Sequence, residues 1–186
     1  MTEALPLRSL WRCQTRVEAQ HFRRTMNSSP SGPALCGDAA SVDSIVAALY
    51  DTISGPAGAD RDWDRLRNLF HASGRLLRTV VAADGGISVT VMDVQAFAEL
   101  AAHYFRTNDF YEREVFRRTD AFGQVAQVFS TYEASSAPDG TGSLGRGING
   151  IQLWSDGKRW WVMSMLWDDE RPGNPIPSQY LSRTGP

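Results

Sequence analysis

The sequence LGRGINGIQLWSDGKRWWVMSMLW, residues 144–167, determines the fold class. Apolar side chains recur at about every second position on both sides of Asp156-Gly157, a dipeptide typical of tight hairpin turns. The pattern predicts two antiparallel strands, over 144–154 and 159–168.

The same period of two extends upstream and predicts two more strands, over 110–118 and 124–134. Glycine weakens a flat strand, and Gly145, Gly147 and Gly150 all fall within one predicted strand. We therefore expect the sheet to bend strongly and to have a concave side.

Ahead of this sheet the apolar period changes to that of amphipathic helices, with Ser41 and Asp93 as N-caps. The predicted helices cover 42–53, about 60–73 and 94–105, and a strand pair at 76–81 and 87–91 precedes the last of them. The expected fold class is α+β, with a curved antiparallel sheet packed on about three helices from the N-terminal half.

The chain of 186 residues is long enough for one well-buried core and too short for two ordinary domains. The linker-like sequence NSSPSGP follows Met26, so residues 1–40 are predicted to be a disordered or over-extended arm, with a weak targeting helix as the alternative. Residues 41–170 form the predicted domain. Residues 171–186, rich in proline, are a tail expected to wrap or dangle.

The amino-acid composition indicates which kinds of partner the protein binds. The net charge is −2, and the basic N-terminal arm leaves an acidic body, which argues against a nucleic-acid surface. No apolar run is long enough for a membrane helix, and no secretory signal is recognisable, so we expect a cytoplasmic protein that does not engage a membrane.

Three segments resemble the nuclear-transport-factor-2-like superfamily, which includes ketosteroid isomerase, scytalone dehydratase and SnoaL-like cyclases. They are Asp62 to Phe70, then Phe122-Gly-Gln-Val-Ala126 with Ser130-Thr-Tyr-Glu133, and Arg146 to Leu153 followed by Arg159-Trp-Trp-Val162. The resemblance covers about 41–170, and the sequence is similar to an uncharacterised branch. It implies a cone-like sheet, a pocket between sheet and helices, and a homodimer formed through the outer sheet face, but no single reaction.

Hairpin register predicts a row of polar side chains on the concave face. A turn at Asp156-Gly157 places Asn149 opposite Ser164, and a turn centred on Ala121 places Glu112 opposite Ser130. With Ser130 beside Asn149, the row crosses four strands within apolar walls, as in a small-molecule pocket.

A carboxyl group in such a pocket loses hydration, which raises its pKa and suits it to general acid or base catalysis. Glu112 and Glu114 are therefore the candidate catalytic residues. The structural alternative is that both carboxylates pair with hydroxyl groups or with arginines such as Arg146, which we also place at the pocket.

Other expected pocket-lining residues come from several elements. Tyr132 and Trp160 lie on the same predicted face as Glu114. Tyr50, on the first helix, could reach the pocket or belong to the core, and His71 could face its mouth or lie at the surface.

No cofactor or metal site is expected. Gly145-Arg-Gly-Ile-Asn-Gly150 matches a dinucleotide-binding pattern, but a strand follows where a helix is required. The expected function is a protein that binds a small apolar organic ligand, with weak acid/base isomerase, dehydratase or cyclase activity. The alternative is a non-catalytic dimeric interaction module, associating through an outer face that would carry Trp161, Met163, Met165 and Trp167.

Overall fold

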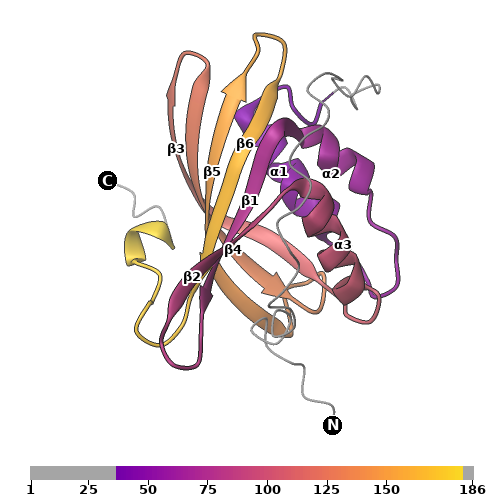
Figure 1. Ribbon diagram of the computed structural model, residues 1–186, viewed down its shortest axis with the longest axis vertical. Helices are drawn as coiled ribbons and strands as arrows, with labels where there is room; N and C mark the ends of the chain where they lie inside the picture. The colour runs from indigo at the N-terminus through magenta and orange to yellow at the C-terminus, as the bar shows by residue number, and fades with distance from the viewer. Residues whose placement is uncertain (1–36, 182–186) are drawn as a thin grey trace, which may run out of the picture.

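The computed structural model describes residues 37–181, which form one six-stranded sheet with helices on one face (Figure 1). The spatial order of the strands is β2-β1-β6-β5-β4-β3. The α+β class with a curved, unclosed sheet is confirmed. The strands are β1 (Phe70–Val81), β2 (Ile87–Met92), β3 (Tyr111–Phe122), β4 (Val125–Ser135), β5 (Ser143–Ser155) and β6 (Trp160–Asp169).

All neighbouring strands are antiparallel except β1 and β6, which are parallel. This pairing joins the early β1–β2 hairpin to the last strand of the chain. It makes the sheet mixed, and it brings Arg78 on β1 opposite Trp167 on β6.

Helices α1 (Val42–Ile53), α2 (Trp63–Leu69) and α3 (Val94–Phe105) cover the concave face. Ser41 and Asp93 cap α1 and α3 through their side chains, as the sequence predicts. Helix α2 is shorter than expected because β1 already begins at Phe70.

Gly74 lies within β1, at an irregularity where the strand backbone passes close to β6. A Cβ at this position would lie 2.9 Å from the carbonyl oxygen of Val162. Gly74 therefore permits a close approach of two strands, at a position just beyond the end of the helix predicted over about 60–73.

The core lies between the helices and the concave face, where Ile45, Leu66, Val128, Ile151 and Val162 are almost inaccessible to solvent. These side chains come from both layers of the fold. No helix within residues 37–181 is both long and apolar enough to cross a membrane.

A β-bulge in β6 decides which of its side chains face the helices. Leu153 of β5 pairs with Val162, but Gln152 pairs with Ser164, so Met163 is an extra residue. Beyond this bulge, each side chain of β6 lies on the face opposite to the one that simple alternation would give it. Met165 and Trp167, expected on the outer face, therefore face the helices.

The hairpin registers differ from the predicted ones because both turns lie at other positions than expected and because each hairpin contains a bulge. The β5–β6 loop has four residues rather than two, and with the bulge it places Asn149 opposite Trp167. The β3–β4 turn follows Phe122 rather than being centred on Ala121, and together with a one-residue bulge in β3 it places Glu112 opposite Ala134 rather than Ser130. The predicted neighbours Ser130 and Asn149 are paired.

The ends of the described chain belong to the fold. Ala39 is buried and its carbonyl oxygen accepts a hydrogen bond from the Trp160 amide at 2.8 Å, so the ordered structure starts before residue 41. Of the predicted arm at residues 1–40, residues 1–36 lie outside the described residues.

The tail from Arg171 to Leu181 crosses the convex face of the sheet (Figure 1). The Tyr180 ring lies 5.0 Å from that of Phe129, and its carbonyl oxygen accepts a hydrogen bond from Thr131 at 2.7 Å. The predicted tail therefore wraps onto the outer face and adds a short 3-10 helix, Ser178–Tyr180.

Candidate functional site

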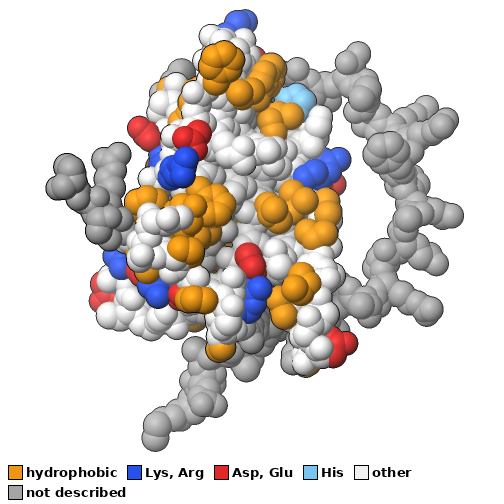
Figure 2. All heavy atoms as spheres, turned by 90° about the vertical axis from the view of Figure 1, so that its left-hand side faces the viewer, with side chains coloured by type: hydrophobic (Ala, Val, Ile, Leu, Met, Phe, Trp, Pro, Cys, Tyr) orange, Lys and Arg blue, Asp and Glu red, His pale blue; other side chains and the backbone are white. Residues whose placement is uncertain are grey.

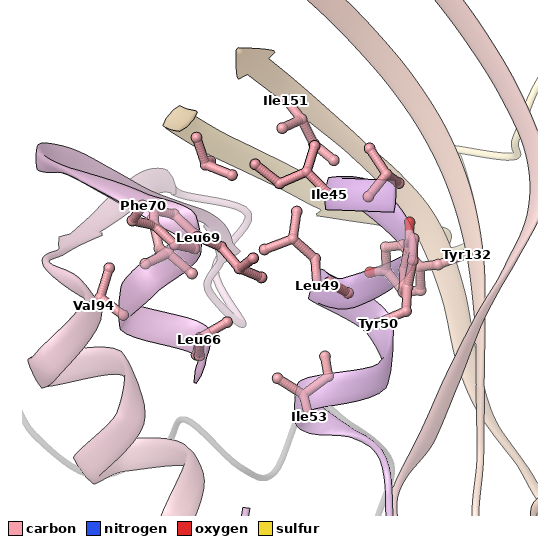
Figure 3. Close-up of a cluster of buried hydrophobic side chains, with 14 of the residues drawn as sticks. Ile45, Leu49, Tyr50, Ile53, Leu66, Leu69, Phe70, Val94, Tyr132 and Ile151 are labelled. Atoms are coloured by element: carbon pink, nitrogen blue, oxygen red, sulfur yellow. The ribbon is translucent and has the colours of Figure 1, made fainter. Parts of the chain in front are cut away.

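A cavity of about 100 Å³ lies between the helices and the concave face of the sheet. Figure 3 shows Leu49, Tyr50 and Ile53 of α1 on one side and Leu66 of α2 on the other. Most of the wall is apolar. Its apolar residues are Leu49, Ile53, Leu66, Phe70, Leu76, Phe97, Leu100, Ala101, Tyr104, Phe105, Phe110, Met165 and Trp167.

Besides the hydroxyl of Tyr104 and the indole N–H of Trp167, six further side chains bring polar or charged groups to the wall. Five of them come from the sheet, so the cavity has a polar floor on the strands and largely apolar sides on the helices. The six residues are Tyr50, Arg78, Glu112, Tyr132, Asn149 and Asp169.

Glu112 on β3 is the carboxyl with the most perturbed acidity in this floor. Removal from bulk water raises its pKa to about 8, and the negative charge of Asp169 acts in the same direction. The amide of Asn149 opposes the shift by hydrogen bonding to the carboxylate. At neutral pH the group is therefore mostly a carboxylic acid, which can donate a proton, and the smaller carboxylate fraction can accept one.

Asp169, at the end of β6, is the second carboxyl of the floor. The Tyr132 hydroxyl donates a hydrogen bond of 2.5 Å to it, and the Arg78 guanidinium lies 3.4 Å away. Burial raises the pKa of Tyr132 and lowers the pKa of Arg78. Asp169 therefore belongs to a cation–carboxylate–phenol group, in which its charge is compensated.

Gly147 makes room for this arrangement. A Cβ at that position would lie 2.5 Å from the Tyr132 hydroxyl oxygen and would also collide with the carbonyl oxygen of Asp168. The glycine is thus required where the tyrosine ring crosses β5, in addition to any effect on curvature.

Behind the floor, hydroxyl groups link α1 to the sheet. Asn149 donates to the Tyr50 hydroxyl at 3.1 Å, and this hydroxyl lies 2.6 Å from Ser130 Oγ. Ser130 in turn donates to Glu114. Burial and the nearby charge of Glu112 raise the pKa of Tyr50, so its hydroxyl stays protonated.

Glu114, the other predicted catalytic carboxylate, forms an ion pair instead. Both of its oxygens accept from Arg117, at 2.8 and 2.6 Å, and Arg117 also reaches Asp43 at 2.5 Å. This bidentate ion pair matches the alternative in which the Glu114 carboxylate has a structural rather than a catalytic role. Glu114 and Ser130 lie behind the cavity wall rather than in it.

Two of the predicted pocket residues lie on the convex face. His71 packs edge-on against Trp154 and Trp161, with ring centroids 5.9 and 6.3 Å apart, because β1 starts at Phe70 and turns position 71 outward. Ser164 follows the β6 bulge and donates to Gln152 at 3.1 Å.

The remaining two also lie away from the cavity wall. Arg146 is outward on β5 and pairs with Glu170, so it cannot neutralise Glu112 in the manner expected. Trp160 faces the helices but packs against the core near Ala39, at the end of the sheet remote from the polar floor.

The sequence reasoning missed Arg78, Asp169 and Trp167. The signal for Arg78 was a single cation within an apolar strand, and the signal for Asp169 was a carboxylate at the end of another. Their meeting depends on the parallel β1–β6 pairing, which no local pattern indicates. Within residues 37–181, no three histidine, cysteine or acidic side chains are grouped so as to hold a metal ion.

No known family model matches the sequence, and no curated protein is similar to it. Solved structures do show similarity. An NTF2-like protein of unknown function from Pseudomonas putida matches with a TM-score of 0.53 and 12% identity over 78% of this chain and 94% of its own. A protein of unknown function from Mycobacterium tuberculosis matches with a TM-score of 0.53 and 18% identity over 70% of each chain.

A third match, also of unknown function, is described as having a cystatin-like fold and comes from Nostoc punctiforme. Its TM-score is 0.53 at 11% identity, covering 73% of this chain and 92% of its own. At such identities the similarity concerns the fold alone.

Proposed function

We propose that this protein, whose fold is that of the nuclear-transport-factor-2-like superfamily, binds a small, largely apolar organic molecule in the cavity and exchanges a proton with it through Glu112. The fold commonly forms ligand-binding pockets. The observation that carries the proposal is a desolvated carboxyl, with a pKa of about 8, on the polar floor of an otherwise apolar cavity.

The composition of the wall supports binding. Apolar side chains would provide most of the contact area, and the polar floor would orient the ligand. Glu112 and Asn149 come from neighbouring parts of one rigid sheet, so a bound polar group would meet them in a fixed geometry.

The acidity of Glu112 supports chemistry in which a proton moves to or from the substrate. A general acid or base works best when its pKa is near the working pH, and the value for Glu112 is about 8. Isomerisation, dehydration and cyclisation of a carbonyl compound all need such a transfer at a carbon or oxygen atom. We therefore assign Glu112 as the catalytic residue and Asn149 as its hydrogen-bonding partner.

The test is proton exchange at a carbon next to a carbonyl. Cyclohexanone in D₂O, followed by proton NMR, should lose its α-proton signals faster with the protein than with buffer alone. Glu112→Gln should remove the acceleration while the protein remains folded. Glu99→Gln, a matched change on the exposed side of α3, should retain it. Equal exchange rates for the parent protein and Glu112→Gln would remove the catalytic assignment.

The convex face favours a second candidate function, association with another copy of the chain. An apolar row crosses five strands of this face, and each of its members pairs with the next on the neighbouring strand. The row consists of Val91, Leu77, Leu166, Gly150 and Phe129. Leu166 is 46% exposed and Val91 is 56% exposed. Figure 2 shows hydrophobic patches on this face.

Such a row would be buried in a dimer formed through the outer sheet face. Sedimentation equilibrium at micromolar concentration tests this proposal. Leu166→Asp should convert a dimer into a monomer and leave the cavity unchanged. A monomeric parent protein would overturn it.

A further inference from the structure

We infer that the cavity selects uncharged, single-ring organic molecules that carry one carbonyl or hydroxyl group, and that it discriminates against the corresponding carboxylates and ammonium ions. This inference rests on the proposed function, because it specifies the chemical class of the ligand bound at the same site. Three properties of the wall support it, namely its volume, its aromatic rings and its balance of charge.

The volume limits the ligand to about one ring. The cavity measures about 100 Å³. An engineered apolar cavity of about 150 Å³ is known to bind benzene, so the present one, at about two thirds of that volume, has room for one ring at most. A fused two-ring molecule would have to displace side chains of the packed core.

Aromatic rings surround the space where such a molecule would lie. Phe97 of α3 meets Trp167 of β6 edge to face, with ring centroids 6.4 Å apart. Tyr104, Phe105 and Phe110 contact one another, with centroid distances of 5.1 to 6.3 Å. Walls of this kind favour a ring that can pack edge to face or offset against them.

The charges of the floor are already balanced. The charged groups of the wall are one arginine, Arg78, and two carboxyls, Asp169 and Glu112. Asp169 compensates Arg78 at 3.4 Å, and Glu112 is kept in its neutral form by its surroundings. The cavity therefore offers no net charge to a ligand.

An anionic ligand would have to displace Asp169 from Arg78, leaving one carboxylate without its cation in an apolar setting. An ammonium ligand would have to ionise Glu112, against the desolvation that keeps it protonated. A neutral carbonyl or hydroxyl requires neither change. It would accept a hydrogen bond from the Glu112 acid at the floor, with its ring between α3 and β6.

The experiment compares four compounds that differ in one property each. Benzyl alcohol is the neutral single ring, benzoate and benzylammonium carry a charge of either sign, and 1-naphthalenemethanol adds a second ring. Binding to the full chain at pH 7 is followed by NMR of methyl-labelled methionine. Met165 lies in the cavity wall, and Met163, outside it at the β6 bulge, is the internal control. Met165→Leu identifies the signal of Met165.

Benzyl alcohol should shift the Met165 methyl signal and leave that of Met163 in place, with an affinity at least tenfold higher than that of each other compound. Equal or tighter binding of benzoate or benzylammonium would overturn the charge selection. Equal binding of 1-naphthalenemethanol would overturn the size limit. If no compound moves the Met165 signal, the proposed function fails together with this inference.

Discussion

The hydroxyl of Tyr50 on α1 lies 2.6 Å from that of Ser130 on β4, and both residues are buried. The direction of this hydrogen bond follows from its neighbours. Ser130 uses its single proton toward Glu114, so Tyr50 must donate to Ser130 and accept from Asn149. The donors thus point in one direction, from the cavity floor to the carboxylate of Glu114.

Removing one hydroxyl from this series should destabilise the fold. Ser130→Ala leaves the buried Tyr50 hydroxyl without its acceptor and removes one of the two hydrogen bonds to Glu114 Oε1, which keeps Arg117. The change should cost about 1–3 kcal/mol of unfolding free energy. Urea denaturation measures the change. Ser164→Ala is the matched control, because its hydroxyl bonds to Gln152 on the convex face and its loss should cost less than about 0.5 kcal/mol. Equal losses for the two variants would contradict the directed series.

The raised pKa of Glu112 should make stability depend on pH. The folded protein holds this proton up to a pKa of about 8, whereas the unfolded chain releases it near 4.5. The folded state therefore binds more protons between these values, so the stabilisation contributed by Glu112 is fully present below about pH 4.5 and is lost as pH rises through 8. The slope contributed by this group approaches about 1.4 kcal/mol per pH unit.

Glu112→Gln should remove that slope. The amide is uncharged at every pH, so the unfolding free energy of the variant should vary less between pH 5 and 8 than that of the parent protein. Chemical denaturation at each pH measures both. Glu99→Gln, with an exposed carboxylate, should keep the parent slope. A parent protein with equal stability at pH 5 and pH 8 would show that Glu112 is ionised throughout.

Gly147 should tolerate substitution less well than Gly150. In Gly147→Ala the new methyl group would lie 2.5 Å from the Tyr132 hydroxyl oxygen and force the ring away from Asp169. We expect a loss of about 1–3 kcal/mol, as for other overpacked sites. Gly150→Ala, whose nearest neighbour would be 3.6 Å away, should lose less than about 1 kcal/mol. Thermal denaturation of both variants makes the comparison.

Most of the fold could be predicted because it follows from local periodicity. The caps Ser41 and Asp93 and the change from helical to alternating patterns place the elements within a few residues. The face exchange in β6 could not be predicted in this way. A bulge at Met163 leaves the composition unchanged, yet it moves Met165 and Trp167 from one face to the other.

The candidate site was predictable only in part. Four of the predicted residues lie at the cavity wall, namely Tyr50, Glu112, Tyr132 and Asn149. The pairing of Ser130 with Asn149 was predicted correctly, and the register error of Glu112 is four residues, an even number that keeps the side chain on its face. Arg78 could not be placed there. Its contact with Asp169 depends on a parallel pairing between strands about 90 residues apart, which loop lengths and turn residues do not specify.

The charge balance at the floor predicts how the ligand preference can be changed. Asp169→Asn removes the carboxylate that compensates Arg78 and leaves the cavity with a net positive charge at neutral pH. Benzoate should then bind at least tenfold more tightly than to the parent protein, while the affinity for benzyl alcohol should change less than threefold. The methyl NMR signal of Met165 reports both affinities.

Asp168→Asn provides the matched control for this variant. It removes the same charge one residue earlier, where the carboxylate pairs with Arg171 at 2.5 Å outside the cavity wall. A general effect of net charge on the attraction of anions would raise benzoate affinity equally in both variants, since long-range attraction depends little on the position of one charge. A rise confined to Asp169→Asn would instead mean that benzoate meets Arg78 directly, because only that variant leaves the buried guanidinium without its carboxylate.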